Sequence, residues 1–184
     1  MSEAMELLQY PNPALFRRSV DMEVGDPTAA DLIKEMTEKL YEWSGIGLAA
    51  PQVGILKRVA VIDLREEPRR LYVLINPRII WRSVETEESG EGCLSVPLLR
   101  ETIFRHKTIT VEYLDENFSP QTIQKAEGLL SFCIQHEIDH MNGHLFIDHL
   151  SKSGRSQAIK KFKELQNEFM AQNTAEVAPE NETL

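Results

Sequence analysis

The sequence predicts an α+β fold, in which antiparallel or mixed β-sheets pack around a central helix. The central helix is expected at residues 128–141, because apolar residues and histidines recur there at helical spacing and an Asn-Gly pair follows. Strands are expected from short runs that are rich in β-branched residues and bounded by turn-forming residues. Amphipathic stretches near both ends of the chain add an N-terminal and a C-terminal helix.

The first helix is expected to follow an extended arm over residues 7–20, where prolines predict turns. Asp26-Pro27 has the pattern of an N-cap followed by proline at the first helical position. Apolar residues then recur at three- and four-residue spacing, and we expect Gly45 to end this helix. They are Ala29, Leu32, Ile33, Met36 and Leu40.

The stretch from Gly45 to Gly54 is made of small residues with glycine and proline, a composition that favours neither a helix nor a strand. Glycine allows a backbone to approach a ligand closely. Composition alone nevertheless favours a buried turn packed under the core. Gln52 is the one side chain of this stretch with functional potential.

Two strands are expected at residues 58–64 and 71–76, with a charged turn between them and Pro77 closing the second. Residues 79–81 form a further short candidate strand. The stretch 85–91 is acidic and contains glycine, so it predicts a loop.

Later in the chain, residues 108–114 alternate and predict a half-buried strand, with 121–125 as its hairpin partner. A basic amphipathic helix is expected over residues 151 to about 173. Residues 174–184 predict a disordered acidic tail. Because no clear linker divides the chain, we expect one domain over residues 1–173.

The composition and charge of the chain argue against some classes of function. The formal net charge of −9 argues against a general nucleic-acid binder, including a DNA-binding protein. No apolar run is long enough to span a membrane, and no signal peptide is seen, so we expect a cytoplasmic protein with reduced thiols. Cys93 and Cys133 are therefore weak disulfide candidates, which leaves metal binding or burial.

The central helix carries the motif His-Glu-x-x-His at His136, Glu137 and His140. Residues four apart lie on the same helical face, so the two histidines can close on a single metal ion. Glu137 lies close enough to reach a water at that ion. The short motif alone is a moderate signal, because two histidines leave a metal incompletely held.

The third metal ligand has candidates on both sides of the motif. His144 and His149 lie downstream, but His144 falls after the expected helix end at Gly143. Cys93 lies upstream in a glycine-containing loop that can hold a thiolate rigidly, and we favour it over a role as a small buried hydrophobe. Cys133 lies one turn before His136 and is more naturally a wall of a pocket.

Leu129, Phe132 and Cys133 precede His136 by seven, four and three residues and share its helical face. They predict an apolar pocket beside the metal, suited to a substrate with an apolar side chain next to the reacting group. Plain core packing explains the same pattern, and both interpretations can hold together.

Three separated segments resemble the signature motifs of the peptide deformylases, in the family's order and with compatible spacing. The resemblance covers roughly residues 5–170. This sequence departs from the family pattern at two places. Met141 stands where leucine is commoner in the family. Leu98 and Leu99 follow the second motif at positions where more polar residues are expected, which affects the rim of the pocket. The segments are Gly45-Ile46-Gly47-Leu48-Ala49-Ala50-Pro51-Gln52, Glu91-Gly92-Cys93-Leu94-Ser95 and Gln135-His136-Glu137-Ile138-Asp139-His140.

The resemblance implies a metallohydrolase that removes the formyl group from the N-terminal formylmethionine of newly made polypeptides and releases formate. It implies that Cys93, His136 and His140 hold one divalent metal ion. In this family the ion is expected to be Fe²⁺, with Zn²⁺, Ni²⁺ or Co²⁺ also possible, whereas the ligand chemistry alone would suggest zinc.

The resemblance also implies roles for the remaining residues. Glu137 is the general base and acid, and the Gln52 amide and the Leu94 backbone N–H form the oxyanion hole. Asp139 and Gln135 are expected to support the site from outside the metal ligands, with Arg100 or Arg105 as the partner of Asp139; an ordinary ion pair explains them equally well. The substrate is expected to bind to Gly45, Ile46, Gly47, Gly92, Leu129, Phe132 and Cys133.

Two other functions fit parts of the sequence. A zinc endopeptidase would need a third metal ligand downstream of the His-Glu-x-x-His motif and a cleft that is open on both sides of the scissile peptide bond. A non-catalytic metal-binding module would close its site with four protein ligands. The basic final helix suggests a contact with ribosomal RNA, although a solvated helix face explains its charge as well. Its cations are Lys152, Arg155, Lys160, Lys161 and Lys163.

Overall fold

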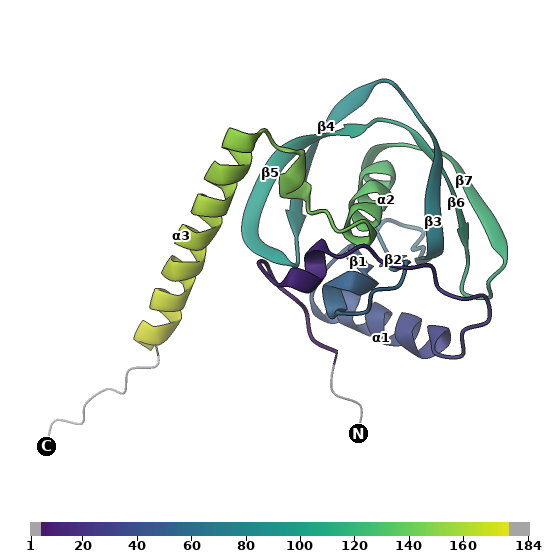
Figure 1. Ribbon diagram of the computed structural model, residues 1–184, viewed down its shortest axis with the longest axis horizontal. Coiled ribbons are helices and arrows are strands. Elements are labelled where there is room, and N and C mark those ends of the chain that lie inside the picture. Colours follow the sequence, from purple (N-terminus) through teal and green to yellow (C-terminus); the bar gives the residue numbers. More distant parts are fainter. Residues whose placement is uncertain (1–4, 177–184) are drawn as a thin grey trace, which may run out of the picture.

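The computed structural model describes residues 5–176 (Figure 1). The helices are α1 (Ala29–Glu42), α2 (Gly128–Met141) and α3 (Lys152–Glu176), with the short 3₁₀ helices η1 (Pro13–Phe16), η2 (Ala50–Val53) and η3 (Phe146–His149). The strands are β1 (Gly47–Ala49), β2 (Val59–Ile62), β3 (Tyr72–Arg82), β4 (Thr86–Cys93), β5 (Val96–His106), β6 (Ile109–Leu114) and β7 (Pro120–Ala126). The predicted α+β class is confirmed.

One antiparallel sheet has the strand order β1-β2-β3-β6-β7. The predicted hairpin of β6 and β7 is confirmed. The prediction that Pro77 closes a strand is wrong, because β3 continues through it to Arg82. The chain accommodates Pro77 with a shift in the register to β6 and a left-handed Asn76, whose φ is +53°. The Asn76 side chain is held in place by hydrogen bonds to both backbone groups of Met22.

The loop predicted at residues 85–91 is wrong. Residues 86–91 belong to β4, which pairs with β5 in a separate antiparallel hairpin. Glutamate and glycine have low strand propensity, but pairing with β5 overrides it here. Cys93 is therefore the last residue of a strand, and the side chains of Ser89, Glu91 and Cys93 share one face because strand residues alternate.

Helix α2 lies between the two sheets, enclosed by strands in Figure 1. Ile134 and Ile138 are buried with residues of β2, β3 and β6, in a cluster that contains Ile62, Leu74 and Ile109. The predicted bounds of α2 are confirmed, as is its end at Gly143, whose φ is +80°. This packing fixes α2, and therefore the histidine motif, with respect to both sheets.

Helix α1 packs on β1 and β2 with the predicted apolar face buried. It ends at Glu42, and Gly45 is not the residue that stops it. Ser44 takes the left-handed conformation, with φ at +56°, and Gly45 N–H donates to Leu40 C=O at 3.0 Å. This is the pattern of a Schellman motif, which directs the chain straight into β1.

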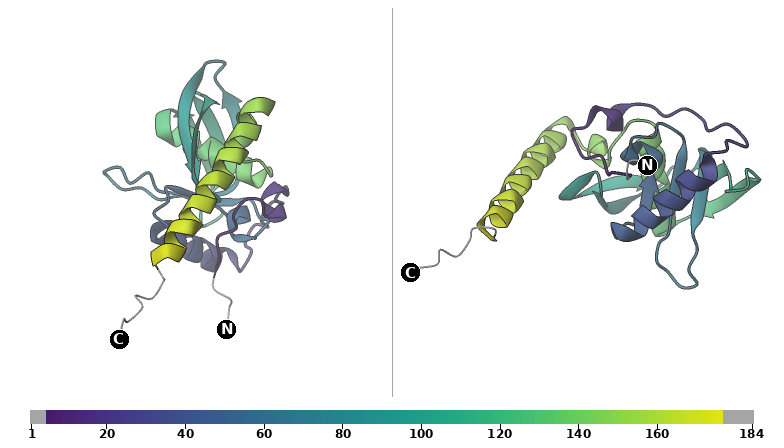
Figure 2. Two further views of the ribbon diagram at one scale, coloured as in Figure 1. Left: turned by 90° about the vertical axis from the view of Figure 1, so that its left-hand side faces the viewer. Right: turned by 90° about the horizontal axis from the view of Figure 1, so that it is seen from below.

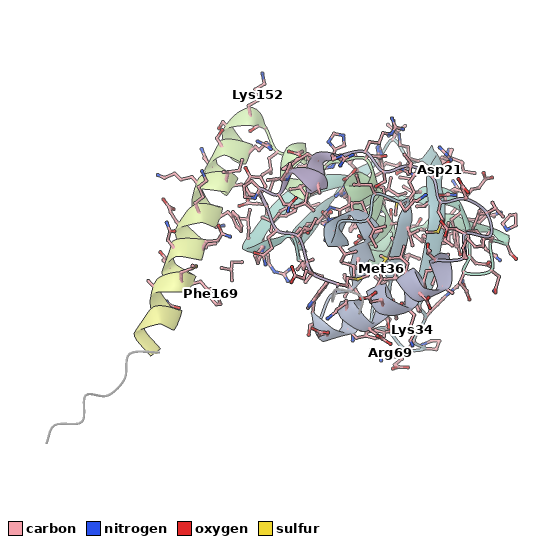
Figure 3. All side chains as sticks on the ribbon, turned by 60° about the horizontal axis from the view of Figure 1, so that its bottom comes forward. Asp21, Lys34, Met36, Arg69, Lys152 and Phe169 are labelled. Atoms are coloured by element: carbon pink, nitrogen blue, oxygen red, sulfur yellow. The ribbon has the colours of Figure 1, made fainter. Side chains whose placement is uncertain are left out.

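Helix α3 lies at one edge of the molecule, and its second half extends away from the sheets in the right-hand view of Figure 2. Its first half packs on β5, where Ala158 and Phe162 are buried with Val96 and Leu99. Phe169 lies further along and is 53% exposed (Figure 3). The helix runs to Glu176, so it includes the first residues of the predicted tail, and residues 177–184 lie outside the described range.

Within residues 5–176, none of the helices combines the length and the apolar character that crossing a membrane requires.

Candidate metal centre

Three side chains that can bind a metal converge where the end of β4 meets α2. Cys93 Sγ lies 3.2 Å from His140 Nε2, which lies 3.2 Å from His136 Nε2. The three donor atoms all lie within 4.8 Å of one another. The favoured third candidate, Cys93, is thus brought to the two histidines, whereas His144 and His149 do not belong to the cluster.

Glu91 holds the His136 ring from the opposite side. Its Oε2 atom lies 2.8 Å from His136 Nδ1. Burial opposes ionisation of Glu91, but Arg105 and His136 outweigh it and lower the pKa of this carboxyl to about 2. The ionised carboxylate is placed to accept a hydrogen bond from Nδ1–H, which leaves Nε2, on the other side of the ring, facing Cys93 and His140.

The donor set fits a divalent cation. Burial by itself would raise the pKa of the Cys93 thiol, but His140 and His136 hold it well below its usual range. A thiolate and imidazole nitrogens directed at one point are the ligands that zinc and related ions prefer. Three protein donors are typical of catalytic sites, which keep a position for water or substrate.

Arg105 lies at the centre of a charged network behind this cluster and is only 3% exposed. Its Nε and Nη2 atoms donate to the two oxygens of Glu91, at 2.8 and 2.9 Å. Its Nη1 donates to Asp139, which also contacts His149 at 2.7 Å. Of the two arginines expected as partners of Asp139, Arg105 is therefore the correct one. The network reaches from partly exposed His149 to His136.

Glu137 lies beside the cluster and is 2% exposed. Burial raises the pKa of its carboxyl to about 7. Within the described part of the chain, its Oε2 has no hydrogen-bond partner. Buried carboxylate oxygens are usually satisfied, so this free oxygen is suited to a water or a substrate group. A pKa near neutrality suits a group that accepts and returns a proton.

Gln52 is fixed by its neighbours with its amide nitrogen toward Cys93. Its Oε1 accepts from Ala49 N–H at 2.9 Å, which orients the other end of the amide. The Nε2 atom then lies 3.2 Å from Ser95 Oγ and 3.5 Å from Cys93 Sγ. The 3₁₀ helix η2 and the turn between β4 and β5 thus place an amide donor beside the cluster.

A cavity of about 720 Å³ opens beside these groups. Gly47 forms part of its wall, and a Cβ atom at this position would lie 2.2 Å from Glu137 Oε1. The glycine is therefore required for Glu137 to occupy its position. All the residues expected to bind the substrate line this cavity: Gly45, Ile46, Gly47, Gly92, Leu129, Phe132 and Cys133. Leu94, His136 and Glu137 line it too.

The sequence interpretation missed the contact of Glu91 with His136 and that of Ser95 with Gln52. Glu91 lies two residues before Cys93, so a strand prediction here would have placed both on one face. The loop prediction concealed that signal. Gln135 does not support the cluster as expected, because it bonds instead to Ser131 and to both backbone groups of His106.

The sequence model of the polypeptide deformylase family matches residues 4–156. The chain belongs to the polypeptide deformylase family. The peptide deformylase of Phenylobacterium zucineum (strain HLK1) is 44% identical over 161 residues, which cover 86% of this chain and 94% of the relative. That of Bartonella quintana (strain Toulouse) is 44% identical over 168 residues, covering 90% and 95%.

Solved structures of peptide deformylases have the same fold. The crystal structure of a peptide deformylase from Legionella pneumophila superimposes with a TM-score of 0.83 at 36% identity, and the match covers 96% of this chain and all of that one. The likeness of sequence and fold therefore extends over the cluster, Glu137 and the cavity.

Proposed function

We propose that the chain hydrolyses the N-formyl group of N-terminal formylmethionine in newly made polypeptides and releases formate. Membership of the polypeptide deformylase family supports this reaction. The observation that carries the proposal is the position of Glu137. This buried carboxylate lies between the cluster of Cys93, His136 and His140 and an apolar cavity.

We propose that Cys93, His136 and His140 are the metal ligands, and that the ion is Fe²⁺, with Zn²⁺, Ni²⁺ and Co²⁺ as the alternatives. The clustering of their donor atoms supports the assignment. A divalent ion bound there supplies Lewis acidity, which lowers the pKa of water and polarises a carbonyl oxygen. Glu91 orients the His136 ring for this task.

Glu137 acts as the general base and acid in the proposed mechanism. It takes a proton from the attacking water, whose oxygen adds to the formyl carbon. When the C–N bond breaks, Glu137 returns the proton to the leaving nitrogen, so that one water is consumed and formate and a free N-terminal amine are released. Its unpartnered oxygen in a buried position supports this role.

Gln52 and the backbone N–H of Leu94 form the proposed oxyanion hole. They donate to the formyl oxygen as it gains negative charge, and removing one such donor costs about 10²- to 10³-fold in rate. The hydrogen bond from Ala49 fixes the Gln52 amide before the substrate arrives. The methionine side chain occupies the apolar part of the cavity, beside Phe132 and Cys133.

A formate-release assay tests this proposal against a zinc endopeptidase. The purified, metal-loaded protein is given formyl-Met-Ala-Ser and, separately, casein. We expect formate from the tripeptide and no cleavage of casein. Proteolysis without formate would reject the proposal, and a metal-loaded protein that is inert toward both would favour the non-catalytic module.

We propose that the enzyme works in the cytoplasm and contacts the ribosome through α3. The second half of α3 projects from the body (Figure 1) and supports a contact surface, whereas the basic residues of α3 all lie in its first half. The basic character of that first half is weaker than the sequence suggests, because Arg155 pairs with Asp148, Lys160 with Glu164 and Lys161 with Glu101. Any attraction to ribosomal RNA would therefore be modest and sensitive to salt.

Removing α3 is a poor test of this contact, because Ala158 and Phe162 belong to the core. Charge reversal at exposed Lys160 and Lys163 avoids that problem, with Lys34→Glu and Lys107→Glu on other surfaces as the matched control. We expect co-sedimentation with ribosomes at low salt to fall only for the α3 pair. An equal effect of both pairs would contradict a specific contact.

A further inference from the structure

Leu98 has a backbone conformation that leucine rarely adopts. Its φ is +67°, in the left-handed region where a Cβ atom crowds the backbone and glycine or asparagine is favoured. The hairpin register explains how it arises. Gly92 pairs with Arg100 but Cys93 pairs with Val96, so residues 97–99 bulge out of β5. Bulges beside active sites commonly redirect a side chain.

The bulge separates two adjacent leucines. Leu99 is 2% exposed and packs in the core with Val96 and Phe162. Leu98 is 52% exposed and lines the cavity that also contains His136 and Glu137. An exposed leucine and a left-handed leucine are each unfavourable for stability. Both occur at one residue at the edge of the site, which points to a function for its side chain.

Two other exposed apolar side chains line the same cavity. Leu129 in the first turn of α2 is 46% exposed, and Ile46 just before β1 is 37% exposed. We define Ile46, Leu98 and Leu129 as the apolar rim. They come from three separate parts of the chain and meet at one cavity, whereas Phe132 and Cys133 lie further from solvent. A cluster of exposed apolar residues at a cavity indicates a binding surface.

The proposed substrate passes this rim. A polypeptide is far larger than the cavity of about 720 Å³, so only its formylmethionyl end can enter and the residues that follow must leave past the exposed lining residues. In an extended peptide, successive side chains point to opposite sides. One of the two residues after methionine therefore directs its side chain toward the rim.

We propose that Leu98 is a specificity-determining residue, through which the enzyme favours substrates with an apolar side chain at one of the two positions after formylmethionine. This inference rests on the proposed function. Partly burying a leucine side chain of the peptide against the rim should raise kcat/KM by about five- to tenfold over serine. Ile46 and Leu129 also belong to the residues expected to bind the formylmethionyl end, so Leu98 is the rim residue that the test varies.

The test compares three peptides as C-terminal amides: formyl-Met-Leu-Ser, formyl-Met-Ser-Leu and formyl-Met-Ser-Ser. Arg100 is exposed and also lines the cavity, so it would attract a terminal carboxylate. The C-terminal amide removes that charge from the peptides. The enzymes are the wild type, Leu98→Asn and Phe104→Asn. Phe104 is a matched control, since it lies on the same strand, is 62% exposed and is not among the residues that line the cavity.

We expect the wild type and Phe104→Asn to prefer one leucine peptide over the serine peptide by about five- to tenfold, and Leu98→Asn to bring that ratio to within about twofold of one. Asparagine adopts a positive φ more readily than leucine, so Leu98→Asn should keep or raise the melting temperature while losing the preference. This separates a role in recognition from a role in folding.

Equal kcat/KM for all three peptides in the wild type, or an unchanged ratio in Leu98→Asn, would overturn the inference. The proposed function would still stand in that case, because the peptides would still release formate. Failure to release formate from any of the peptides would overturn the proposed function and this inference with it.

Discussion

Glu91 Oε2 lies 2.8 Å from His136 Nδ1, and the same carboxylate accepts two hydrogen bonds from the guanidinium group of Arg105. This single side chain therefore joins the metal-type cluster to a buried ion pair. It fixes which nitrogen of His136 faces Cys93. Carboxylates that orient a ligand histidine in this way strengthen metal binding.

Glu91→Gln should weaken metal binding by about 10- to 100-fold, because an amide oxygen is a poorer acceptor for Nδ1–H and leaves Arg105 partly unpaired. Competition with a chromophoric chelator measures the dissociation constant. Glu88→Gln is the control, since Glu88 lies on the same strand and is exposed. An unchanged constant for Glu91→Gln would show that the contact is incidental.

Gly47→Ala should lower kcat/KM by at least about 100-fold, because the new methyl group would lie 2.2 Å from Glu137 Oε1 and must displace it. Overpacking should also cost about 1–3 kcal/mol of stability. Steady-state kinetics and thermal unfolding measure the two effects. Gly90→Ala serves as the control, because a Cβ there meets no atom within 4 Å. Similar losses in both variants would contradict the account.

Arg105→Lys should destabilise the fold by about 3 kcal/mol, because an ammonium group cannot hold both oxygens of Glu91 and reach Asp139 at once. Urea unfolding gives the change in free energy. Arg100→Lys is the control on the same strand, and it should have little effect since Arg100 is exposed. Equal stability of the two variants would mean that the buried network contributes little.

The metal-free protein should react with iodoacetamide at Cys93 near pH 7. The pKa of the Cys93 thiol is held well below its usual range, so the thiolate is already present at that pH. Burial and Glu137 raise the pKa of Cys133 well above its usual range, so this thiol should stay unmodified. Peptide mass mapping identifies the modified residue, and reloading with metal should protect it. Modification of Cys133 first would contradict this ordering.

The sequence predicted best the elements whose periodicity is strong. The bounds of α2 could be predicted because its apolar residues and histidines repeat at helical spacing and Gly143 ends it. The hairpin of β4 and β5 could not, since Glu85–Glu91 looks like a loop until β5 pairs with it. Tertiary pairing outweighs local propensity in such strands.

More of the metal-ligand cluster than of the residues around it could be predicted from the sequence. The spacing of His136 and His140 places both on one helical face, and the glycine-containing surroundings of Cys93, together with the resemblance to the family's second motif, favour it as the third ligand. The contacts of Glu91 and Ser95 depend on β4 and β5, which the sequence did not predict. The left-handed Leu98 depends on a bulge whose register only the folded hairpin reveals.

The most direct test of the account is to measure metal content and formate release together in wild type and Glu137→Gln, both purified without oxygen. We predict one divalent ion per chain in each protein and a loss of about 10²- to 10⁴-fold in kcat for the variant. The variant should unfold at the same or a higher temperature, since a buried charge is removed. A variant that keeps its metal and releases formate at the wild-type rate would contradict the central claim that Glu137 transfers the proton.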